Sequence, residues 1–142
     1  MRRTSLIGIA LAGVALALSA CGGGSSTGGD PQSLVGTSYA VTAITIDGGD
    51  REVFDPVEIS FAADSISVAT PCNGMSGPVT YSDTTLTVGA LASTKMACEP
   101  PLMEQDQVIA DALAANPTWQ VTGSQLTLTS GGTVITADST QS

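Results

Sequence analysis

Residues 57–68 read VEISFAADSISV and carry apolar side chains at alternate positions, namely Val57, Ile59, Phe61, Ile66 and Val68. Alternation with a period of two is typical of half-buried antiparallel strands, because successive side chains of a strand point to opposite faces. Asp64 and Ser65 separate the two halves and are residues that favour turns. The stretch therefore predicts two antiparallel strands joined by a turn.

The same alternation recurs on both sides of this stretch. It is marked by Tyr39 with Val41 and Ala43, Val79 with Tyr81, Leu86 with Val88, Trp119 with Val121, Leu126 with Leu128, and Val134. Turn residues lie between these segments, as in Asp47-Gly48-Gly49-Asp50 and Gly131-Gly132. About eight short strands at this spacing indicate a mainly β fold class, either a small barrel or a sandwich.

One segment departs from the strand pattern and predicts a single α-helix at about residues 101–115. Pro100-Pro101 precedes it and Asn116-Pro117 follows it, and prolines at these places mark helix boundaries. Leu102, Ile109 and Leu113 would share one narrow face, because residues three, four or seven apart lie one above another. Asp106 falls on the same apolar face, which is an unusual place for a carboxylate.

The first residues resemble a bacterial export signal. Arg2 and Arg3 precede an apolar run from Leu6 to Leu18, which is too short to span a membrane as a helix. The run ends in Leu18-Ser19-Ala20-Cys21, which resembles the sequence at which bacterial lipoproteins are cleaved and acylated on cysteine. We expect residues 1–20 to be a signal peptide and Cys21 to carry lipid, so that the protein is anchored on the extracytoplasmic side of a membrane of the cell envelope.

The rest of the chain divides into a tether, one domain and a tail. Residues 21–33 are rich in Gly and Ser, which predicts a flexible tether. Residues 34–137 suffice for one domain, and residues 138–142 form a tail.

Loss of the leader removes Arg2 and Arg3 and leaves two basic residues against 13 acidic ones, a formal charge of −11. Such a surface repels nucleic acid, so nucleic acid is not an expected partner.

Cys72 and Cys98 remain once Cys21 is assigned to the anchor. Two cysteines in an exported domain more often form a disulfide than a metal site. We therefore expect a Cys72–Cys98 bridge, and neither a metal ion nor another cofactor.

Several segments together resemble the META domain, the family of HslJ-type envelope and secreted proteins. They are Cys72-Asn73-Gly74-Met75-Ser76-Gly77, Ser93-Thr94-Lys95-Met96-Ala97-Cys98, the helix, and residues 119–128. The resemblance covers about residues 34–137 and implies a lipocalin-like barrel with one helix. It also links the chain to heat-shock and antibiotic-tolerance responses, without a defined biochemical activity. Pro71 and Asp106 depart from the Gly and Glu that are usual in the family.

The sequence contains no histidine, which excludes catalytic triads and metal sites that need an imidazole. Asp47, Asp50, Glu52 and Asp55 lie close together but lack the spacing of a calcium loop. The sharper cluster is Asn73, Lys95 and Asp106, which the disulfide would draw together. We expect Asp106 to point inward, toward backbone amides or Lys95, as a polar clamp between helix and barrel.

These observations favour a monomeric protein without enzymatic activity, with a structural or binding role at the envelope and with an envelope protein as a possible partner. A first alternative is a carrier of small apolar ligands, in which Tyr39, Phe61, Tyr81 and Trp119 would line an open lumen. A second is an enzyme that works with carboxylates alone, which would require two acids facing one pocket.

Overall fold

The computed structural model of the protein describes residues 29–141. The expected signal peptide and the lipidation at Cys21 lie outside these residues. The elements in chain order are η1 (Pro31–Ser33), β1 (Ser38–Ile46), β2 (Gly49–Arg51), β3 (Glu58–Phe61), β4 (Ser65–Ala69), β5 (Gly74–Tyr81), β6 (Leu86–Val88), β7 (Ala92–Ser93), α1 (Pro100–Ala114), β8 (Thr118–Thr122), β9 (Gln125–Ser130) and β10 (Thr133–Ser139).

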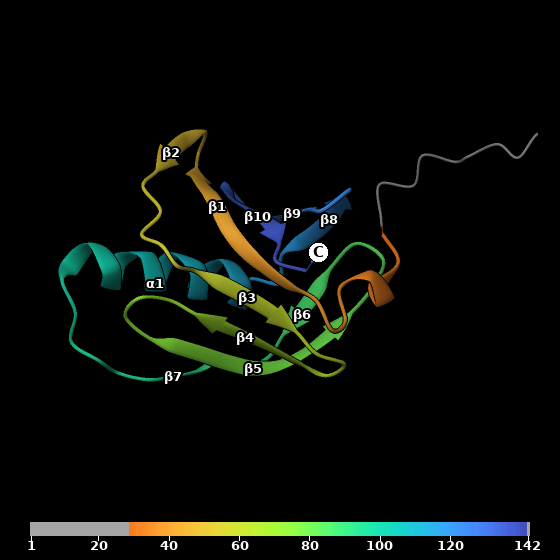
Figure 1. The fold of residues 1–142 in the computed structure, drawn as a ribbon, viewed down its shortest axis with the longest axis horizontal. Coiled ribbons are helices and arrows are strands. Elements are labelled where there is room, and N and C mark those ends of the chain that lie inside the picture. The colour runs from red at the N-terminus through yellow and green to blue at the C-terminus, as the bar shows by residue number, and fades with distance from the viewer. Residues whose placement is uncertain (1–28, 142) are drawn as a thin grey trace, which may run out of the picture.

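Eight strands form one curved antiparallel sheet in the order β6-β5-β4-β3-β1-β10-β9-β8 (Figure 1). A bridge between Thr85 and Thr118 brings the two ends of this order together. The sheet is therefore a nearly closed barrel, which confirms the mainly β fold with about eight strands. The short strands β2 and β7, which the alternation did not predict, pair with β1 and β5.

The hairpin predicted from residues 57–68 is formed by β3 and β4. Ile59 pairs with Val68 and Phe61 pairs with Ile66, and all four side chains are buried. Between these residues, Ser67 is exposed and Ser60 is half-buried, as the alternation requires. The turn residues Asp64 and Ser65 are exposed. This part of the prediction is confirmed in both register and facing.

In two strands, the residues that face the core differ from those that the alternation predicts. In β1 the pairing shifts between Val41 and Ala43, so Ala43 is exposed and Ile44 is buried in its place. The reason is a bulge, which adds a residue to one strand and reverses the facing beyond it. In β10 the buried residues are Ile135 and Ala137, while Val134 is only half-buried. The prediction for Ala43 and Val134 was wrong by one position in each strand.

The helix is confirmed as α1 and starts at Pro100, one residue before its expected start. Ile109 and Leu113 are fully buried in the core, whereas Leu102 is half-buried. Beyond the helix, Asn116 adopts a φ of 55° and its side chain accepts a hydrogen bond from the Val88 amide at 2.9 Å. The helix end is thus fixed to β6. No helix within residues 29–141 is long and apolar enough to cross a membrane.

Ordered elements also lie on both sides of residues 34–137. Asp30 caps η1 by accepting a hydrogen bond from the Gln32 amide at 2.9 Å. At the other end, Asp138 still pairs with Gln125, and the Thr140 amide donates to Ser38. The β9–β10 pairing thus continues beyond residue 137, while a capped turn precedes residue 34.

Aromatic side chains fill the barrel interior. Tyr39, Phe61 and Trp119 are only 2–3% exposed and belong to one contiguous core. The Tyr39 and Phe61 rings meet edge to face with centroids 6.0 Å apart. A side chain lining an open lumen would keep exposed area inside it, so these three rings pack the interior instead. The fourth aromatic residue, Tyr81, packs against this core from a half-buried position.

The two tyrosines give the fold a testable response to alkali. Burial raises the pKa of Tyr39, and burial followed by the nearby Asp64 carboxylate raises that of Tyr81. Because both pKa values lie above the unfolded value of about 10, the tyrosines' contribution to stability is complete below that pH and is lost above it. We expect ultraviolet titration to give phenolate only above pH 10 in the folded protein and near pH 10 in urea. A single midpoint common to both states would contradict the burial of these rings.

Candidate functional site

The candidate site starts at the tight turn between β4 and β5. The Thr70 hydroxyl accepts hydrogen bonds from the amides of Cys72 and Asn73, at 3.2 and 3.0 Å. The Thr70 amide and hydroxyl in turn donate to the Asn73 carbonyl. Pro71 lies inside this turn, where its restricted φ favours the tight geometry. The turn therefore presents the Asn73 side chain in a fixed position.

The Asn73 amide joins three parts of the chain. Its nitrogen donates to Asp106 Oδ2 at 2.9 Å and to Cys72 Sγ at 3.0 Å. Its oxygen accepts from the Thr94 hydroxyl and the Met96 amide, both at 2.9 Å. Two donors and two lone pairs are all that an asparagine side chain offers. The β4–β5 turn, the 94–98 loop and α1 are thus held by one fully bonded amide.

The disulfide between Cys72 and Cys98 lies beside this amide. The sulfur atoms are 2.10 Å apart and the Cα atoms 6.0 Å apart, as expected from the sequence. The bridge connects the turn before β5 to Cys98, which precedes the helix N-cap Glu99. It therefore fixes the distance between the Asn73 turn and α1, on which the bond to Asp106 depends.

Asp106 points inward from α1, as expected, and is 8% exposed. Its partner differs from the expectation, however, because Oδ2 accepts from the Asn73 side chain and not from Lys95 or a backbone amide. Its other oxygen, Oδ1, is buried without a hydrogen-bond partner. An orphaned polar atom of this kind is uncommon in folded proteins and needs an explanation.

Lys95 is exposed and lies at the edge of the cluster. It shares a groove with Asn73 and Asp106, but within residues 29–141 the single ion pair joins Arg51 to Glu104. The predicted cluster is thus brought together in space, while the contact between Lys95 and Asp106 is not formed. A lysine ammonium is strongly hydrated and keeps to the surface unless a partner compensates for the lost water.

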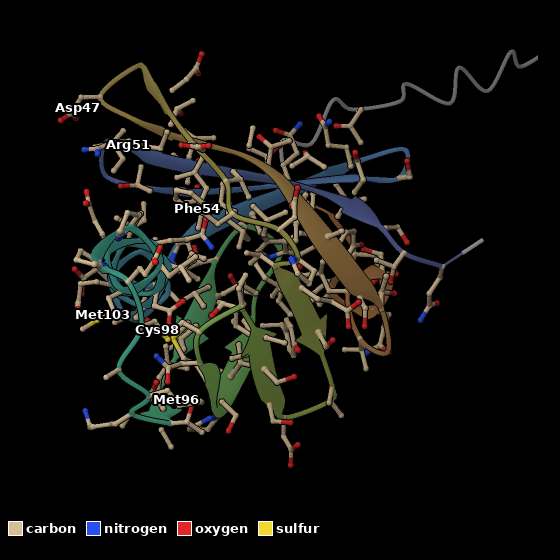
Figure 2. The ribbon with its side chains drawn as sticks, turned by 60° about the vertical axis from the view of Figure 1, so that its left-hand side comes forward. Asp47, Arg51, Phe54, Met96, Cys98 and Met103 are labelled. Carbon is tan, nitrogen blue, oxygen red and sulfur yellow. A yellow bond between two sulfur atoms is a disulfide. The ribbon has the colours of Figure 1, made fainter. Side chains whose placement is uncertain are left out.

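The groove occupies about 450 Å³ between α1, the 94–97 loop and β5. It is lined by Asn73, Met75, Leu91, Ser93, Thr94, Lys95, Met96, Ala97, Met103, Asp106, Gln107 and Ala110. Figure 2 shows Met103 on the helix and Met96 on the loop, on the same side of the molecule as Cys98. Half of the lining side chains are apolar, and Asp106 supplies the one carboxylate among the others.

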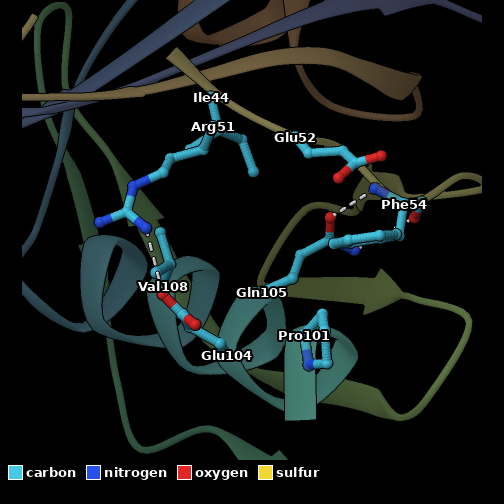
Figure 3. Close-up of a pocket in the computed structure, with 8 residues that line it drawn as sticks. All are labelled: Ile44, Arg51, Glu52, Phe54, Pro101, Glu104, Gln105 and Val108. Atoms are coloured by element: carbon cyan, nitrogen blue, oxygen red, sulfur yellow. Dashed lines mark hydrogen bonds and ion pairs between the residues drawn. The ribbon is translucent and has the colours of Figure 1, made fainter. Parts of the chain in front are cut away.

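A smaller cavity of about 140 Å³ lies on another side of α1 (Figure 3). There Gln105 accepts from the Phe54 amide at 2.8 Å and donates to the Phe54 carbonyl at 3.1 Å. Arg51 and Glu104 meet at 3.2 Å across exposed surface, where an ion pair contributes little to stability. Because the Gln105 amide ties the 51–57 loop to the helix, this cavity is best described as a structural joint.

The acidic residues of the Gly-containing loop do not converge. All four are exposed, and of these four only Glu52 lines the smaller cavity; they are Asp47, Asp50, Glu52 and Asp55. Across residues 29–141, no three His, Cys, Asp or Glu side chains are placed to hold a metal ion.

Sequence reasoning missed Thr94, Gln105 and the methionines. Thr94 and Gln105 bond to residues 21 and 51 positions away, and such long-range pairs leave no local pattern. The methionines carried a weak signal, because Met75 and Met96 lie within the two motifs that include the disulfide cysteines. Only the fold shows that Met103 of the helix joins them.

The fold and this site define a small antiparallel barrel with one helix held to it by a disulfide and a polar clamp. The family model of the META domain matches residues 32–141, and the chain belongs to this family. Among curated proteins, none matches the chain.

Two solved structures are similar to the chain. The first is an NMR structure of a protein from Burkholderia xenovorans, with a TM-score of 0.66 and 24% identity over 78% of this chain and 86% of that one. The second is another NMR structure, with a TM-score of 0.64 and 30% identity over 78% of this chain and 94% of that one. At 24% identity, the first likeness concerns the fold alone.

Proposed function

We propose that the protein is an exported lipoprotein, anchored through lipid on Cys21, whose META domain has a binding role without enzymatic activity at the cell envelope. The leader, the acylation sequence before Cys21 and the Gly/Ser tether support the anchor. The Cys72–Cys98 disulfide supports export, because disulfides persist in oxidising compartments. The kinship with HslJ-type proteins, which the sequence motifs suggest, favours a stress-related role.

One observation carries the binding role, namely the orphaned Oδ1 of Asp106 at a groove lined by apolar and polar side chains in equal number. Grooves that combine apolar walls with a few polar groups are typical ligand sites. In the barrel interior, by contrast, the rings of Tyr39, Phe61 and Trp119 are buried and pack against the core. For this reason we favour an external site over the carrier with an open lumen.

An enzyme that uses carboxylates alone would need two acids facing one pocket. Asp106 is the one acid that lines the larger groove. Two acids, Glu52 and Glu104, line the smaller cavity, but both are exposed and Glu104 is paired with Arg51. We therefore propose that the domain binds its ligand without transforming it, as a monomer and without a cofactor.

The anchor is tested with Cys21→Ala in intact cells, because alanine lacks the sulfur that carries lipid. We expect wild type to sediment with membranes, to partition into detergent and to have the mass of a processed chain with added acyl groups. Cys21→Ala should lose all three properties and keep the fold. Crosslinking with pull-down from both strains then reports partners that depend on the anchor. Equal membrane association of the two forms would contradict the proposal.

A further inference from the structure

The three methionines within residues 29–141 all line one groove. Met75 is buried at its floor, whereas Met96 and Met103 are 63% and 48% exposed. These two are the exposed large apolar side chains of the described residues. Thioether side chains are flexible and polarizable, so they adapt to ligands of varied shape. Their gathering around a single groove points to an apolar part of a ligand.

The carboxylate of Asp106 lacks one hydrogen-bond donor. The residue is more than nine-tenths buried, Oδ2 is bonded to Asn73, and Oδ1 has no partner. Leaving a buried charged acceptor without a donor destabilises the folded state. A ligand with an ammonium group would supply the missing donor and a compensating charge.

Lys95 supplies the opposite charge at the same groove. Its side chain is exposed and lines the groove together with Asp106. The lining thus carries one negative group that is buried and one positive group that is exposed. A purely apolar ligand would leave both without a partner, and an anion would satisfy only the lysine.

We propose that this groove binds a zwitterion with an apolar side chain, either a free α-amino acid or a short peptide. The α-ammonium group donates to Asp106, the carboxylate faces Lys95, and the apolar side chain lies among the methionines. Because Oδ1 is enclosed in the present conformation, binding requires a side chain at the groove floor to move. The inference rests on the binding role proposed above and names its ligand class.

The methionine methyl groups offer a direct test by NMR. The protein is used as the cell produces it, labelled at the methionine methyl groups and held in mild detergent. The groove is then monitored through the signals of Met75, Met96 and Met103. The probes are leucine, leucinamide, N-acetylleucine and the dipeptide Leu-Leu. We expect leucine or Leu-Leu to shift these signals saturably and leucinamide to bind more weakly. N-acetylleucine, which lacks the ammonium group, should not bind.

The comparison of leucine with Leu-Leu distinguishes the two sources of the zwitterion. Tighter binding of leucine assigns the site to a free amino acid, and tighter binding of the dipeptide assigns it to a peptide. Equal binding of leucine and N-acetylleucine, or no response to any of the four probes, would overturn the proposal.

Variants test the two charged contacts separately. Asp106→Asn should weaken binding of leucine and leucinamide about tenfold or more, because a neutral amide loses the charge-assisted bond to ammonium. Lys95→Gln should weaken leucine roughly threefold to tenfold and leave leucinamide unchanged, because leucinamide has no carboxylate to lose. Glu104→Gln, on the same helix but at the other cavity, is the control and should change neither.

Each failure has a distinct meaning. If Asp106→Asn does not fold, Lys95→Gln and the four probes on wild type still decide the question, because Lys95 is exposed. Loss of leucinamide binding in Lys95→Gln would contradict the assigned contacts. A negative probe series together with membrane association through Cys21 would remove the ligand class and leave the anchor proposal intact.

Discussion

Removal of the Cys72–Cys98 disulfide should lower the free energy of unfolding by about 3.5 kcal/mol, because the bridge closes a loop of 26 residues in the unfolded chain. The loop contains β5, β6 and β7, so the chain that forms these strands has more conformational freedom in the unfolded state when the bridge is absent. For a domain of this size the loss corresponds to a fall in melting temperature of roughly 15–25 °C.

Chemical denaturation of wild type and of the variant with Cys72→Ala and Cys98→Ala measures this effect. Reductant should destabilise wild type to the level of the variant and leave the variant unchanged, which separates the bridge from the packing of Cys72. A change below about 1 kcal/mol would mean that the unfolded chain is already constrained there, against the loop-entropy account.

Most of the barrel could be predicted from the sequence because its strands follow a regular alternation. Residues 57–68 gave the correct facing, since both strands lie between partners and no residue interrupts the period. The facing of β1 and β10 could not be read in the same way. The bulge after Val41 depends on pairing with a strand more than ninety residues away. In β10, Val134 and Ile135 are both apolar, so the sequence does not say which one faces inward.

The site was partly predictable for a different reason. The inward position of Asp106 could be predicted because a carboxylate on an apolar helix face conflicts with its surroundings. Such conflicts often mark functional or strained sites. Its bond to Asn73, in contrast, depends on how the disulfide places the turn against the helix. The assignment of Lys95 as partner failed because proximity in the chain and opposite charge do not establish contact. The groove itself becomes visible only in the folded chain.

Replacement of Asn73 by alanine should destabilise the domain by about 3.5–5 kcal/mol, because one bond to a carboxylate contributes about 1.5–3 kcal/mol and two further bonds about 1 kcal/mol each. The variant also leaves Oδ2 of Asp106 without a donor, in addition to Oδ1. The Thr94 hydroxyl and the Met96 amide lose their acceptor, although both are exposed enough to turn to water. The largest single part of the effect should therefore come from the bond to Asp106.

A double-mutant cycle isolates that contact. Asp106→Ala alone should cost about 2–3 kcal/mol, and combining it with Asn73→Ala should cost less than the sum, with a coupling of about 1.5–2 kcal/mol. Asp111→Ala is the matched control, because Asp111 is an exposed carboxylate on the same helix and bonds only to Gln107. Its change should stay within about 0.5 kcal/mol.

If the losses of unfolding free energy from Asn73→Ala and Asp106→Ala add up in urea denaturation, the clamp between the two residues is contradicted, since residues that stabilise each other cannot contribute independently. Coupling together with ligand binding that depends on Asp106 would mean that one carboxylate serves both purposes. Oδ2 then holds the helix to the barrel through Asn73, while Oδ1 is unbonded and accepts from a donor once a side chain at the groove floor moves. Asn73 cannot itself satisfy the second oxygen, because its other amide hydrogen is directed to Cys72 Sγ. The disulfide and the orphaned oxygen are in this way parts of the same arrangement.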